Sequence, residues 1–398
     1  MQKDLVIVGG ARTAMAEYVG SPGYGLFKNT SALELGAVAA KGALHRSGVA
    51  PEQIDHVVIG NALQTSADAL YGARHVGLKA GIPIEVPALT VNRLCGSGIQ
   101  AVVSGAQQII CGDAEVVLAG GMENMSQAPH VIRDAREGMR FGRPPQIEDS
   151  LFASLMDTHC GFYMAETAEN LAKEYGITRE AQDEFALRSH QLGAAAVQKG
   201  LFADEIVPVT VKKGRQEIVV DTDDHIKPDS TLEGLSKLRA AFGKEGTVTA
   251  GNASGIVDGA AVIIITTADR AAAEGWKVCA TIRSWGICGV APETMGFGPV
   301  PSIQLACDKA GIKVGDIDYF EINEAFAAQY LACEKALELD RDKCNVNGGA
   351  LAIGHPLGAT GTRLLITLCN QLEREDKHLG MASACIGGGQ GIAMLIER

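Results

Sequence analysis

The sequence predicts an α/β fold in which two similar halves stack as alternating layers of helices and strands. Short apolar runs alternate with longer alanine-rich stretches of helical period, which is typical of sheets covered by helices. The segment ALHRSGVAPEQID at 43–55 is matched without a gap by ACDKAGIKVGDID at 306–318. The chain has 398 residues, too many for one ordinary hydrophobic core, so we expect two or three structural units.

The expected elements follow one another along the chain. The apolar runs that we expect to form strands lie at 5–9, 56–60, 115–121, 261–267 and 394–397. The stretches that we expect to form helices lie at 33–45, 99–110 and 362–372. This order favours a layered α/β/α/β/α arrangement with mixed sheets. The segment VGGAR at 8–12 is expected to form a turn, but it lacks the G-x-G-x-x-G spacing of a dinucleotide fingerprint.

The repeat places two later residues in equivalent positions. In each copy a helix ends near a glycine, and an aspartate, Asp55 or Asp318, precedes a buried strand. Cys95 lies 40 residues after Asp55, His355 lies 37 residues after Asp318, and each precedes a helical stretch. Two halves that pack about a pseudo-twofold axis would bring these helix starts together. A generic helix–turn–strand motif that occurs twice is the alternative.

The middle of the chain differs in composition from the two halves. Residues 122–250 are richer in proline, aspartate, lysine and arginine, and they contain helical stretches of their own. We interpret them as a long inserted loop domain, since long insertions are often lids or interaction surfaces. The N-terminal half would then consist of 1–121 and 251–275, and the C-terminal half of 276–398.

Composition excludes several classes of function. Hydrophobic residues make up 46% of the chain and charged residues 21%, as in soluble globular proteins. The net charge of −12 argues against nucleic acid or an anionic membrane as a partner, and no apolar stretch approaches the ~18 residues of a membrane span. None of the ten cysteines forms a CxxC pair, so we expect no metal site. A reducing compartment, the cytoplasm by default, fits best, and an uncleaved organellar import signal stays open.

Cys95, within VNRLCGSGIQAV, is the strongest candidate for a nucleophile. It stands at the expected start of a helix, whose positive end would lower the thiol pKa from about 8.5 and favour the thiolate. Gly96 and Gly98 would keep bulk away from the sulfur and let a substrate carbonyl approach two backbone N–H groups. An inert cysteine in an apolar core is the alternative.

Two glycine-rich motifs near the end of the chain hold a histidine and a second cysteine. His355 lies in NVNGGALAIGHPLGATGTR, and a neutral imidazole within reach of a thiol is a suitable base for activating it. Cys385 lies in CIGGGQG. A phosphate-binding loop would need a helix after it, whereas the following IAMLIER is expected to be a closing strand. A structural histidine and a core cysteine are the alternatives.

Two further segments contain candidate polar groups. In EINEAFAAQ, Asn323 follows a buried strand and could orient a water or donate to an oxyanion, although asparagine is also a common helix N-cap. In GTVTAGNASGIVDGAA, small residues flank Ser254 and would let a narrow ligand pass close to the backbone, although a tight interdomain turn has the same composition.

With NRLCGSG, GGMENMS, AGNASG, NEAF, NGGALAIGHPLGATG and CIGGGQG in this order, the chain resembles the thiolase family of acetyl-CoA C-acyltransferases. The resemblance runs from residue 6 to the last residue. It implies a thiolase-like duplicated α/β/α/β/α fold in which the inserted domain binds CoA and contributes oligomer contacts. It also implies acyl-CoA and acetyl-CoA as substrates, no tightly bound cofactor, and a homodimer or homotetramer.

The resemblance further implies roles for individual residues. Cys95 would take up an acyl group, His355 would accept its proton, and Cys385 would move the proton at C2 of acetyl-CoA. The N–H groups of Cys95 and Gly387 would form one oxyanion site, and His355 with a water held by Asn323 would form the other. Ser254 would meet the pantetheine arm and Lys227 the nucleotide end, where well-known members carry an arginine. Leu238, Ala241 and Phe242 would line the adenine side, and Met164, Met295 and Phe326 would shape the acyl end.

The acyl-chain preference stays open. Many short-chain biosynthetic members have histidine where this chain has Tyr163. Acetoacetyl-CoA thiolase is the leading interpretation, and a broad-range 3-ketoacyl-CoA thiolase of fatty-acid degradation is the alternative. A CoA-binding scaffold subunit without catalysis is an alternative from another class, but Cys95, His355 and Cys385 are all present.

Overall fold

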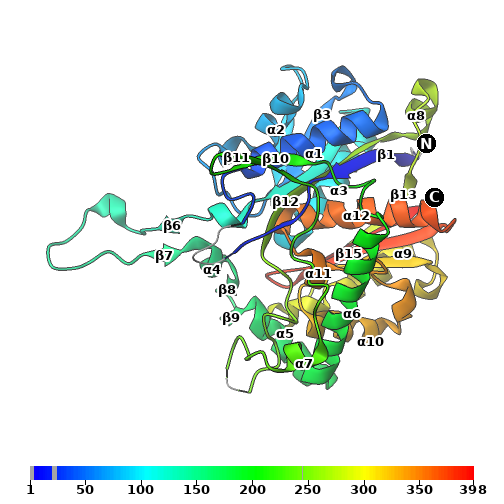
Figure 1. The fold of residues 1–398 in the computed structure, drawn as a ribbon. Coiled ribbons are helices and arrows are strands. Elements are labelled where there is room, and N and C mark those ends of the chain that lie inside the picture. The colour runs from blue at the N-terminus through cyan, green and yellow to red at the C-terminus, as the bar shows by residue number, and fades with distance from the viewer. Residues whose placement is uncertain (1–3, 20–24, 244) are drawn as a thin grey trace.

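The computed structural model describes residues 4–19, 25–243 and 245–398, and its main element is a mixed sheet of ten strands (Figure 1). Along the sheet the strands follow the order β14-β15-β16-β13-β1-β12-β5-β3-β4, and β2 pairs with β12 beside this path. The first half of the chain supplies β1 (Leu5–Arg12), β2 (Ala16–Glu17), β3 (His56–Gly60), β4 (Ala88–Val91), β5 (Val116–Glu123) and β12 (Val257–Thr267). The second half supplies β13 (Ala280–Gly289), β14 (Tyr319–Ile322), β15 (Leu379–Ile386) and β16 (Gln390–Glu397).

The sheet is continuous, but its two halves are joined by a short seam. β1 and β13 pair through two residue pairs, Val6 with Thr281 and Ile7 with Ala280. Within a half the pairing is far longer, as in the eight pairs between β12 and β5. The two half-sheets therefore share an edge while their helices stack between and outside them.

Helices complete five layers, which confirms the predicted α/β/α/β/α order (Figure 1). The outer layer on the first half-sheet contains α1 (Ala32–Ser47) and α2 (Gly72–Ala80). The central layer contains α3 (Ser97–Cys111) and α12 (Leu357–Arg374), which pack against strands of both halves. The outer layer on the second half-sheet contains α9 (Pro299–Ala310) and α10 (Ala327–Leu337), and the shorter α8 (Ala268–Glu274) and α11 (Ala350–Ile353) connect elements.

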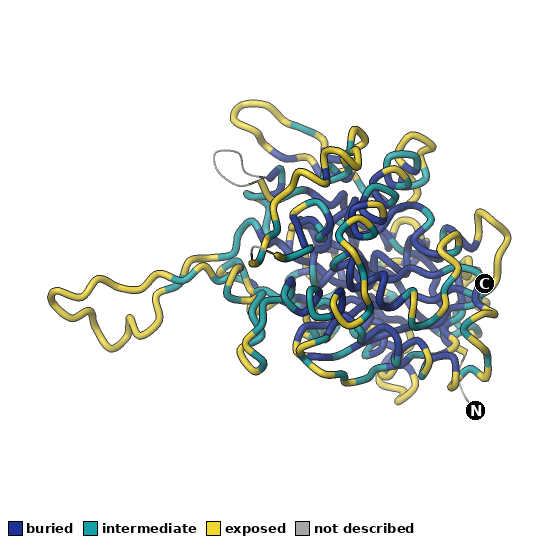
Figure 2. The backbone as a smooth tube through the Cα atoms, turned by 90° about the horizontal axis from the view of Figure 1, so that it is seen from below, coloured by how far each residue is buried: buried dark blue, intermediate teal, exposed yellow. Residues whose placement is uncertain are grey.

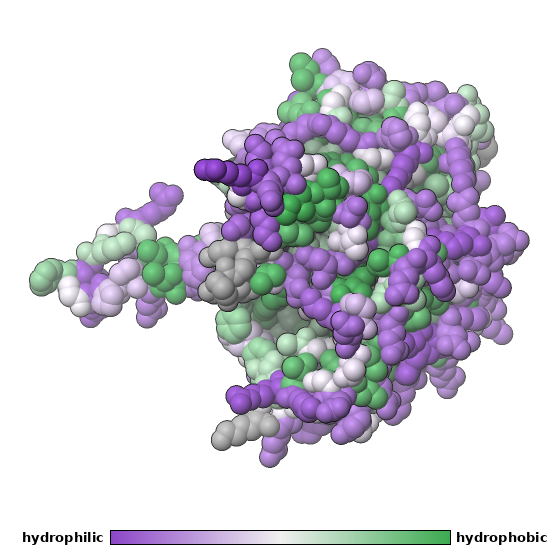
Figure 3. Space-filling model, viewed as in Figure 1, coloured by the Kyte–Doolittle hydropathy of each residue, from purple (hydrophilic) through white to green (hydrophobic). Residues whose placement is uncertain are grey.

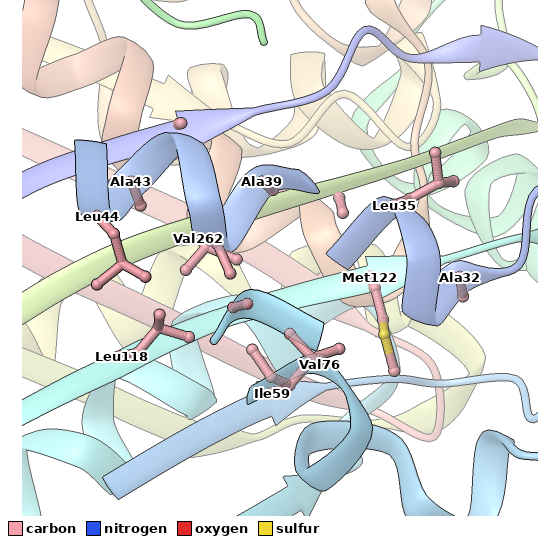
Figure 4. Close-up of a cluster of buried hydrophobic side chains, with 14 of the residues drawn as sticks. Ala32, Leu35, Ala39, Ala43, Leu44, Ile59, Val76, Leu118, Met122 and Val262 are labelled. Atoms are coloured by element: carbon pink, nitrogen blue, oxygen red, sulfur yellow. The ribbon is translucent and has the colours of Figure 1, made fainter. Parts of the chain in front are cut away.

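Alternation along the strands explains the layers. In β12, Val262 and Ile264 belong to the core under α1, whereas Ile263 and Ile265 belong to the central core around α3 and α12. Successive side chains of a strand point to opposite faces, so a strand that is apolar throughout fills two cores. Figure 4 shows Val262 near Ala39 and Ala43 of α1. The predicted turn at 8–12 is wrong, because these residues belong to strand β1, which continues to Arg12.

Hydrogen bonds confirm the internal repeat. The Asp55 side chain accepts from the N–H groups of Glu115 and Val116 at 2.9 Å. The Asp318 side chain accepts from His378 and Leu379 at 3.0 and 2.9 Å, so each aspartate ties its own strand to the start of the next parallel strand. The same bond at the same sequence separation in both halves is the signature of a duplicated unit.

The insertion forms a separate set of short elements between β5 and β12. Its elements are β6 (His130–Val131), β7 (Glu148–Asp149), α4 (Ser150–Ser154), β8 (Met156–Asp157), β9 (Phe162–Tyr163), α5 (Met164–Tyr175), α6 (Arg179–Gln198), β10 (Val209–Lys213), β11 (Gln216–Val220) and α7 (Leu232–Ser236). The hairpin that contains β6 and β7 projects far from the body and is exposed along its length (Figures 1 and 2). Because β5 continues to Glu123 and β12 begins at Val257, the segment between these two strands is 124–256, compared with the predicted insertion of 122–250. The division into domains stays a prediction.

The two central helices approach each other through glycines. A Cβ atom on Gly98 of α3 would lie 2.6 Å from the Thr362 nitrogen, and one on Gly361 of α12 would lie 2.5 Å from the Ile99 nitrogen. These are backbone atoms that no rotamer change can move aside, so only glycine permits this contact. The contact sets the distance between the starts of α3 and α12.

We predict that Gly98→Ala forces the two helices apart and lowers the free energy of unfolding by about 1–3 kcal/mol. Chemical denaturation measures this change, and turnover should fall with it. Gly315→Ala is the matched control, since nothing lies within 4 Å of a Cβ at that position. Equal stability of the Gly98 variant and the unchanged protein would contradict the packing argument.

Candidate active site

The two halves and the insertion enclose one cavity of about 460 Å³ with largely apolar walls. Nine of the thirteen predicted site residues line this cavity: Cys95, His355, Gly387, Ser254, Ala241, Phe242, Met164, Met295 and Phe326. The other four, Cys385, Asn323, Lys227 and Leu238, lie outside the lining. Residues more than 250 positions apart in the sequence therefore share one chamber.

Cys95 is presented by a strained turn. It lies in the short helix η3 (Leu94–Gly96), directly before α3, and the preceding Leu94 adopts a φ of 46°, a left-handed conformation that is rare for leucine. Hydrogen bonds hold this turn: Leu94 N–H donates to the Asn92 side chain at 2.9 Å, and the Ser97 hydroxyl donates to the Leu94 carbonyl at 2.7 Å. Strain of this kind persists where the surrounding structure fixes an exact direction for a side chain.

The predicted lowering of the Cys95 pKa is wrong. Burial raises the pKa of the thiol to about 11, and the negative charge of Glu123 acts in the same direction. The N–H groups of Gly387 and of Cys95 itself oppose this rise, but they do not outweigh the loss of water. The resting nucleophile is a thiol, so the site needs a base that removes its proton.

The two glycines beside Cys95 have a different role from the predicted one. A Cβ on Gly96 would lie 2.5 Å from Ile386, and one on Gly98 would meet the backbone of α12. Both glycines therefore permit close packing of the nucleophile turn against β15 and α12. They do not clear space for a substrate.

His355 is a neutral imidazole with a defined orientation. Its Nδ1 lies 2.6 Å from the Thr360 hydroxyl, which donates its own proton to the Pro356 carbonyl at 3.0 Å. Thr360 must then accept from Nδ1, which leaves a lone pair on Nε2. Burial lowers the pKa of His355 to about 3, and Arg363 adds to the effect. A neutral ring whose Nε2 carries a lone pair is the form that a base needs.

Asn323 lies beside this ring. Its Nδ2 is 3.3 Å from His355 Nε2, and its backbone N–H donates to the Ser383 carbonyl at 2.8 Å. It precedes α10 by several residues, so the helix N-cap alternative is wrong. Asn323 does not line the cavity itself, but its side chain contacts His355, which does.

The AGNASG segment holds two parts of the site together. Ser254 N–H donates to the Ala325 carbonyl at 3.0 Å, and His355 N–H donates to the Gly255 carbonyl at 3.0 Å. The segment thus lies between the NEAF loop and the histidine loop. It serves as a wall of the cavity, which contradicts the alternative of a mere interdomain turn.

Cys385 lies directly behind the cavity wall. It is fully buried near the end of β15, and it packs with Met295 and Ala325, which line the cavity. Burial raises the pKa of its thiol, and the nearby Cys95 raises it further. The two sulfur atoms therefore belong to one electrostatic environment, although Cys385 itself is not part of the lining.

An aromatic wall closes another side of the cavity. The Tyr163 ring lies 4.8 Å from that of Phe152 and 5.2 Å from that of Phe242, measured between centroids. All three rings line the cavity. Sequence reasoning singled out Tyr163 and Phe242 but missed Phe152, which carries no distinguishing signal in the sequence.

Two predicted contacts lie elsewhere. Lys227 is half-exposed, and its Nζ forms an ion pair with Glu17 at 2.8 Å. Leu238 is partly exposed and packs against Gly251, next to the cavity lining. Neither residue reaches the chamber that holds Cys95.

Comparison with known proteins identifies the family. Residues 5–269 match the N-terminal domain of thiolase, and residues 276–398 match its C-terminal domain. The chain is 48% identical over 395 residues to the human mitochondrial 3-ketoacyl-CoA thiolase, covering 99% of this chain and 98% of that protein. It is 48% identical to the acetyl-CoA acetyltransferase of Escherichia coli K12, covering 100% and 99%.

This chain belongs to the thiolase family. The crystal structure of the human mitochondrial 3-ketoacyl-CoA thiolase in complex with CoA superimposes with a TM-score of 0.95 at 48% identity, covering 100% of this chain and 98% of that chain. The resemblance inferred from the motifs is confirmed, and with it the thiolase fold. Two relatives of equal identity carry different names, so overall similarity leaves the chain-length class undecided.

Further observations concern metal sites, membrane-spanning helices and cysteines. Among residues 4–19, 25–243 and 245–398, no group of three or more His, Cys, Asp or Glu side chains is arranged to hold a metal ion. No helix in these ranges is long and apolar enough to cross a membrane. The structure describes all ten cysteines, and each of them is free.

Thr360 is a residue that sequence reasoning missed, because a threonine one helical turn after His355 has no distinctive pattern. We predict that Thr360→Val lowers kcat by up to about 10²-fold, since the imidazole loses the acceptor that sets its orientation and proton position. Steady-state turnover measures this effect. Thr360→Ser keeps the hydroxyl and should restore activity; if serine and valine behave alike, the hydroxyl does not orient the ring.

Proposed function

We propose that this thiolase catalyses the reversible Claisen condensation of acetyl-CoA with an acyl-CoA, and the reverse thiolysis of a 3-ketoacyl-CoA, through an acyl group on Cys95. Acetoacetyl-CoA is the leading substrate. The observation that carries the proposal is one cavity with largely apolar walls that both Cys95 and His355 line, with Cys385 behind its wall. CoA takes part as a substrate and product, and we propose no tightly bound cofactor.

In the first stage, Cys95 attacks the thioester carbonyl while His355 Nε2 takes the thiol proton, and His355 then passes this proton to the departing CoA thiolate. A thiol with a pKa of about 11 and an imidazole with a pKa of about 3 both start uncharged. A concerted transfer avoids a costly isolated charge in the buried site. The N–H groups of Cys95 and Gly387, which already face the sulfur, would stabilise the oxyanion that forms next to it.

In the second stage, Cys385 gives its thiol proton to the neutral Nε2 of His355 and, as a thiolate, takes the proton from C2 of acetyl-CoA. The resulting enolate attacks the acyl group on Cys95, and the departing Cys95 thiolate recovers a proton from His355. His355, together with a water held by Asn323, would stabilise the enolate oxygen. The 3.3 Å contact between Asn323 and His355 supports this pairing. Donors placed where charge develops lower the barrier by several kcal/mol, and the loss of one typically costs about 10²–10³ in rate.

The CoA moiety would enter past the insertion. Ser254 lines the cavity on this side and suits the pantetheine arm. Ala241 and Phe242, which also line the cavity, would face the adenine together with Leu238. Met164, Met295 and Phe326 would surround the acyl group. Lys227 stays a prediction for the nucleotide end, where a phosphate would compete with Glu17 for its charge.

The second candidate is a broad-range 3-ketoacyl-CoA thiolase of fatty-acid degradation. Tyr163 favours it, because an aromatic residue stands where many short-chain members have histidine. A scaffold subunit without catalysis is not supported, since the three reactive side chains surround one cavity.

Assembly and compartment remain proposals. We propose a homodimer or homotetramer, which the projecting hairpin supports because it exposes Met139, Phe141 and Ile147 to solvent (Figure 3). No nucleic-acid or membrane partner is proposed. The free cysteines suit a reducing compartment, and we propose the cytoplasm, with an uncleaved organellar import signal as the alternative.

The role division between the sulfur atoms leads to a test with radiolabelled acetyl-CoA. Cys95→Ser should fold and bind CoA but lose turnover and labelling. Cys385→Ala should still become acetylated on Cys95 but fail at condensation, because only the second stage needs its thiol. Turnover by the Cys95 variant equal to wild type would exclude the mechanism, and a Cys385 variant that cannot be acetylated would contradict the division.

A series of 3-ketoacyl-CoA substrates from C4 to C16 tests the chain-length class. We expect kcat/KM to be highest at C4 and to fall with length, because the aromatic wall closes the acyl end. Tyr163→Ala should open the wall and raise the relative rate on longer chains, whereas Tyr163→Phe keeps the ring and should leave the profile unchanged. A flat wild-type profile would favour the broad-range enzyme instead.

A further inference from the structure

Glu123, at the end of β5, is a buried carboxylate that the proposed mechanism does not use. It is 0% exposed and forms no ion pair among the described residues. Its Oε1 accepts from Asn61 Nδ2 and Leu63 N–H, each at 2.9 Å. Its Oε2 accepts from Ala62 N–H at 3.1 Å and Gly358 N–H at 2.9 Å. Four donors from two distant segments converge on one charge.

One branch of this network leads to the nucleophile. The Ala62 N–H donates to Glu123, and the Ala62 carbonyl accepts from Asn92 Nδ2 at 3.1 Å. The Asn92 side-chain oxygen in turn accepts from the Leu94 N–H at 2.9 Å. Three hydrogen bonds, through Ala62 and Asn92, therefore connect Glu123 to the left-handed Leu94, the residue that precedes Cys95.

The other branch leads to the base. Gly358 lies in the first turn of α12, three residues after His355, and its N–H is one of the helix donors that lack a partner within the helix. Close backbone packing presses this turn against the strand ends, since a Cβ on Gly121 would lie 1.8 Å from the Gly358 carbonyl. A negative charge at this helix start is favourable and holds the turn that carries His355 and Thr360.

We propose that Glu123 is a positioning residue that holds the Cys95 turn and the His355 turn in register, so that thiol and imidazole meet at the productive distance. The inference rests on the proposed function, because it concerns the proton transfer between these two side chains. Glu123 touches neither the substrate nor the reacting atoms. Its effect passes through Asn92 on one side and through Gly358 on the other.

The charge of Glu123 has a second, separable effect. Burial is the largest cause of the raised pKa of the Cys95 thiol, and the charge of Glu123 adds to this rise. Burial raises the pKa of Glu123 itself to about 7, and Asp258 of β12 contributes. The other ionisable groups that face Cys95 are Cys385 of β15, which is protonated in the resting enzyme, and the neutral His355. Removing the charge should make the thiol more acidic while the geometry becomes worse.

Glu123→Gln tests both effects at once. Its amide places a donor against N–H groups that need an acceptor, so kcat should fall by about 10²-fold with little change in the KM for acetyl-CoA. The rate at which iodoacetamide alkylates Cys95, located by mass spectrometry, should show its pH midpoint at lower pH than in the wild type. A purely structural role would not produce slower turnover together with a more acidic thiol.

Two other variants complete the experiment. Asn92→Ala breaks only the branch to Cys95, at an exposed site, so it should lower kcat less and leave the alkylation midpoint in place. Glu205→Gln is the control, because this buried carboxylate pairs with Arg12 outside the cavity lining and should affect thermal stability alone. Wild-type kcat in Glu123→Gln, or in Asn92→Ala if the first variant does not fold, would overturn the inference. If the wild-type protein itself shows no turnover, the proposed function is overturned instead. The pH midpoint of alkylation would still show whether the charge of Glu123 acts on the Cys95 thiol.

Discussion

The backbone contact between α3 and α12 is the constraint on which the rest of the site depends. Gly98 and Gly361 let the first turns of these helices touch, and each turn belongs to a different half of the duplicated chain. Cys95 precedes one helix and His355 precedes the other. The packing of the two halves therefore brings a thiol and an imidazole into the lining of one cavity.

Burial, rather than the helix start, determines the charge state of these groups. The sequence suggests a thiolate, since a helix N-terminus favours negative charge. In the structure α3 begins two residues after Cys95, and the loss of water outweighs the N–H groups that face the sulfur. The same loss of water keeps His355 neutral. An uncharged pair of this kind exchanges its proton only when a substrate arrives, which protects the thiol in the resting enzyme.

The insertion converts this pair into an enclosed chamber. The AGNASG segment bonds to both the NEAF loop and the histidine loop, and Tyr163 and Phe242 form part of the aromatic wall. The insertion therefore supplies part of the cavity wall, while Cys95 and His355 come from the duplicated core.

The sequence by itself determined the layered fold and the duplication, and it singled out Cys95, His355, Cys385 and Asn323 as candidates, because motifs and strand periodicity are local properties of the chain. It misjudged the role of Gly96 and Gly98 and the direction of the Cys95 pKa, and it contained no sign of Thr360 or Phe152 as parts of the site. Only the tertiary structure decided these points. Both points depend on segments hundreds of residues away. Those segments supply the backbone that packs against a glycine, and they exclude the water around a thiol.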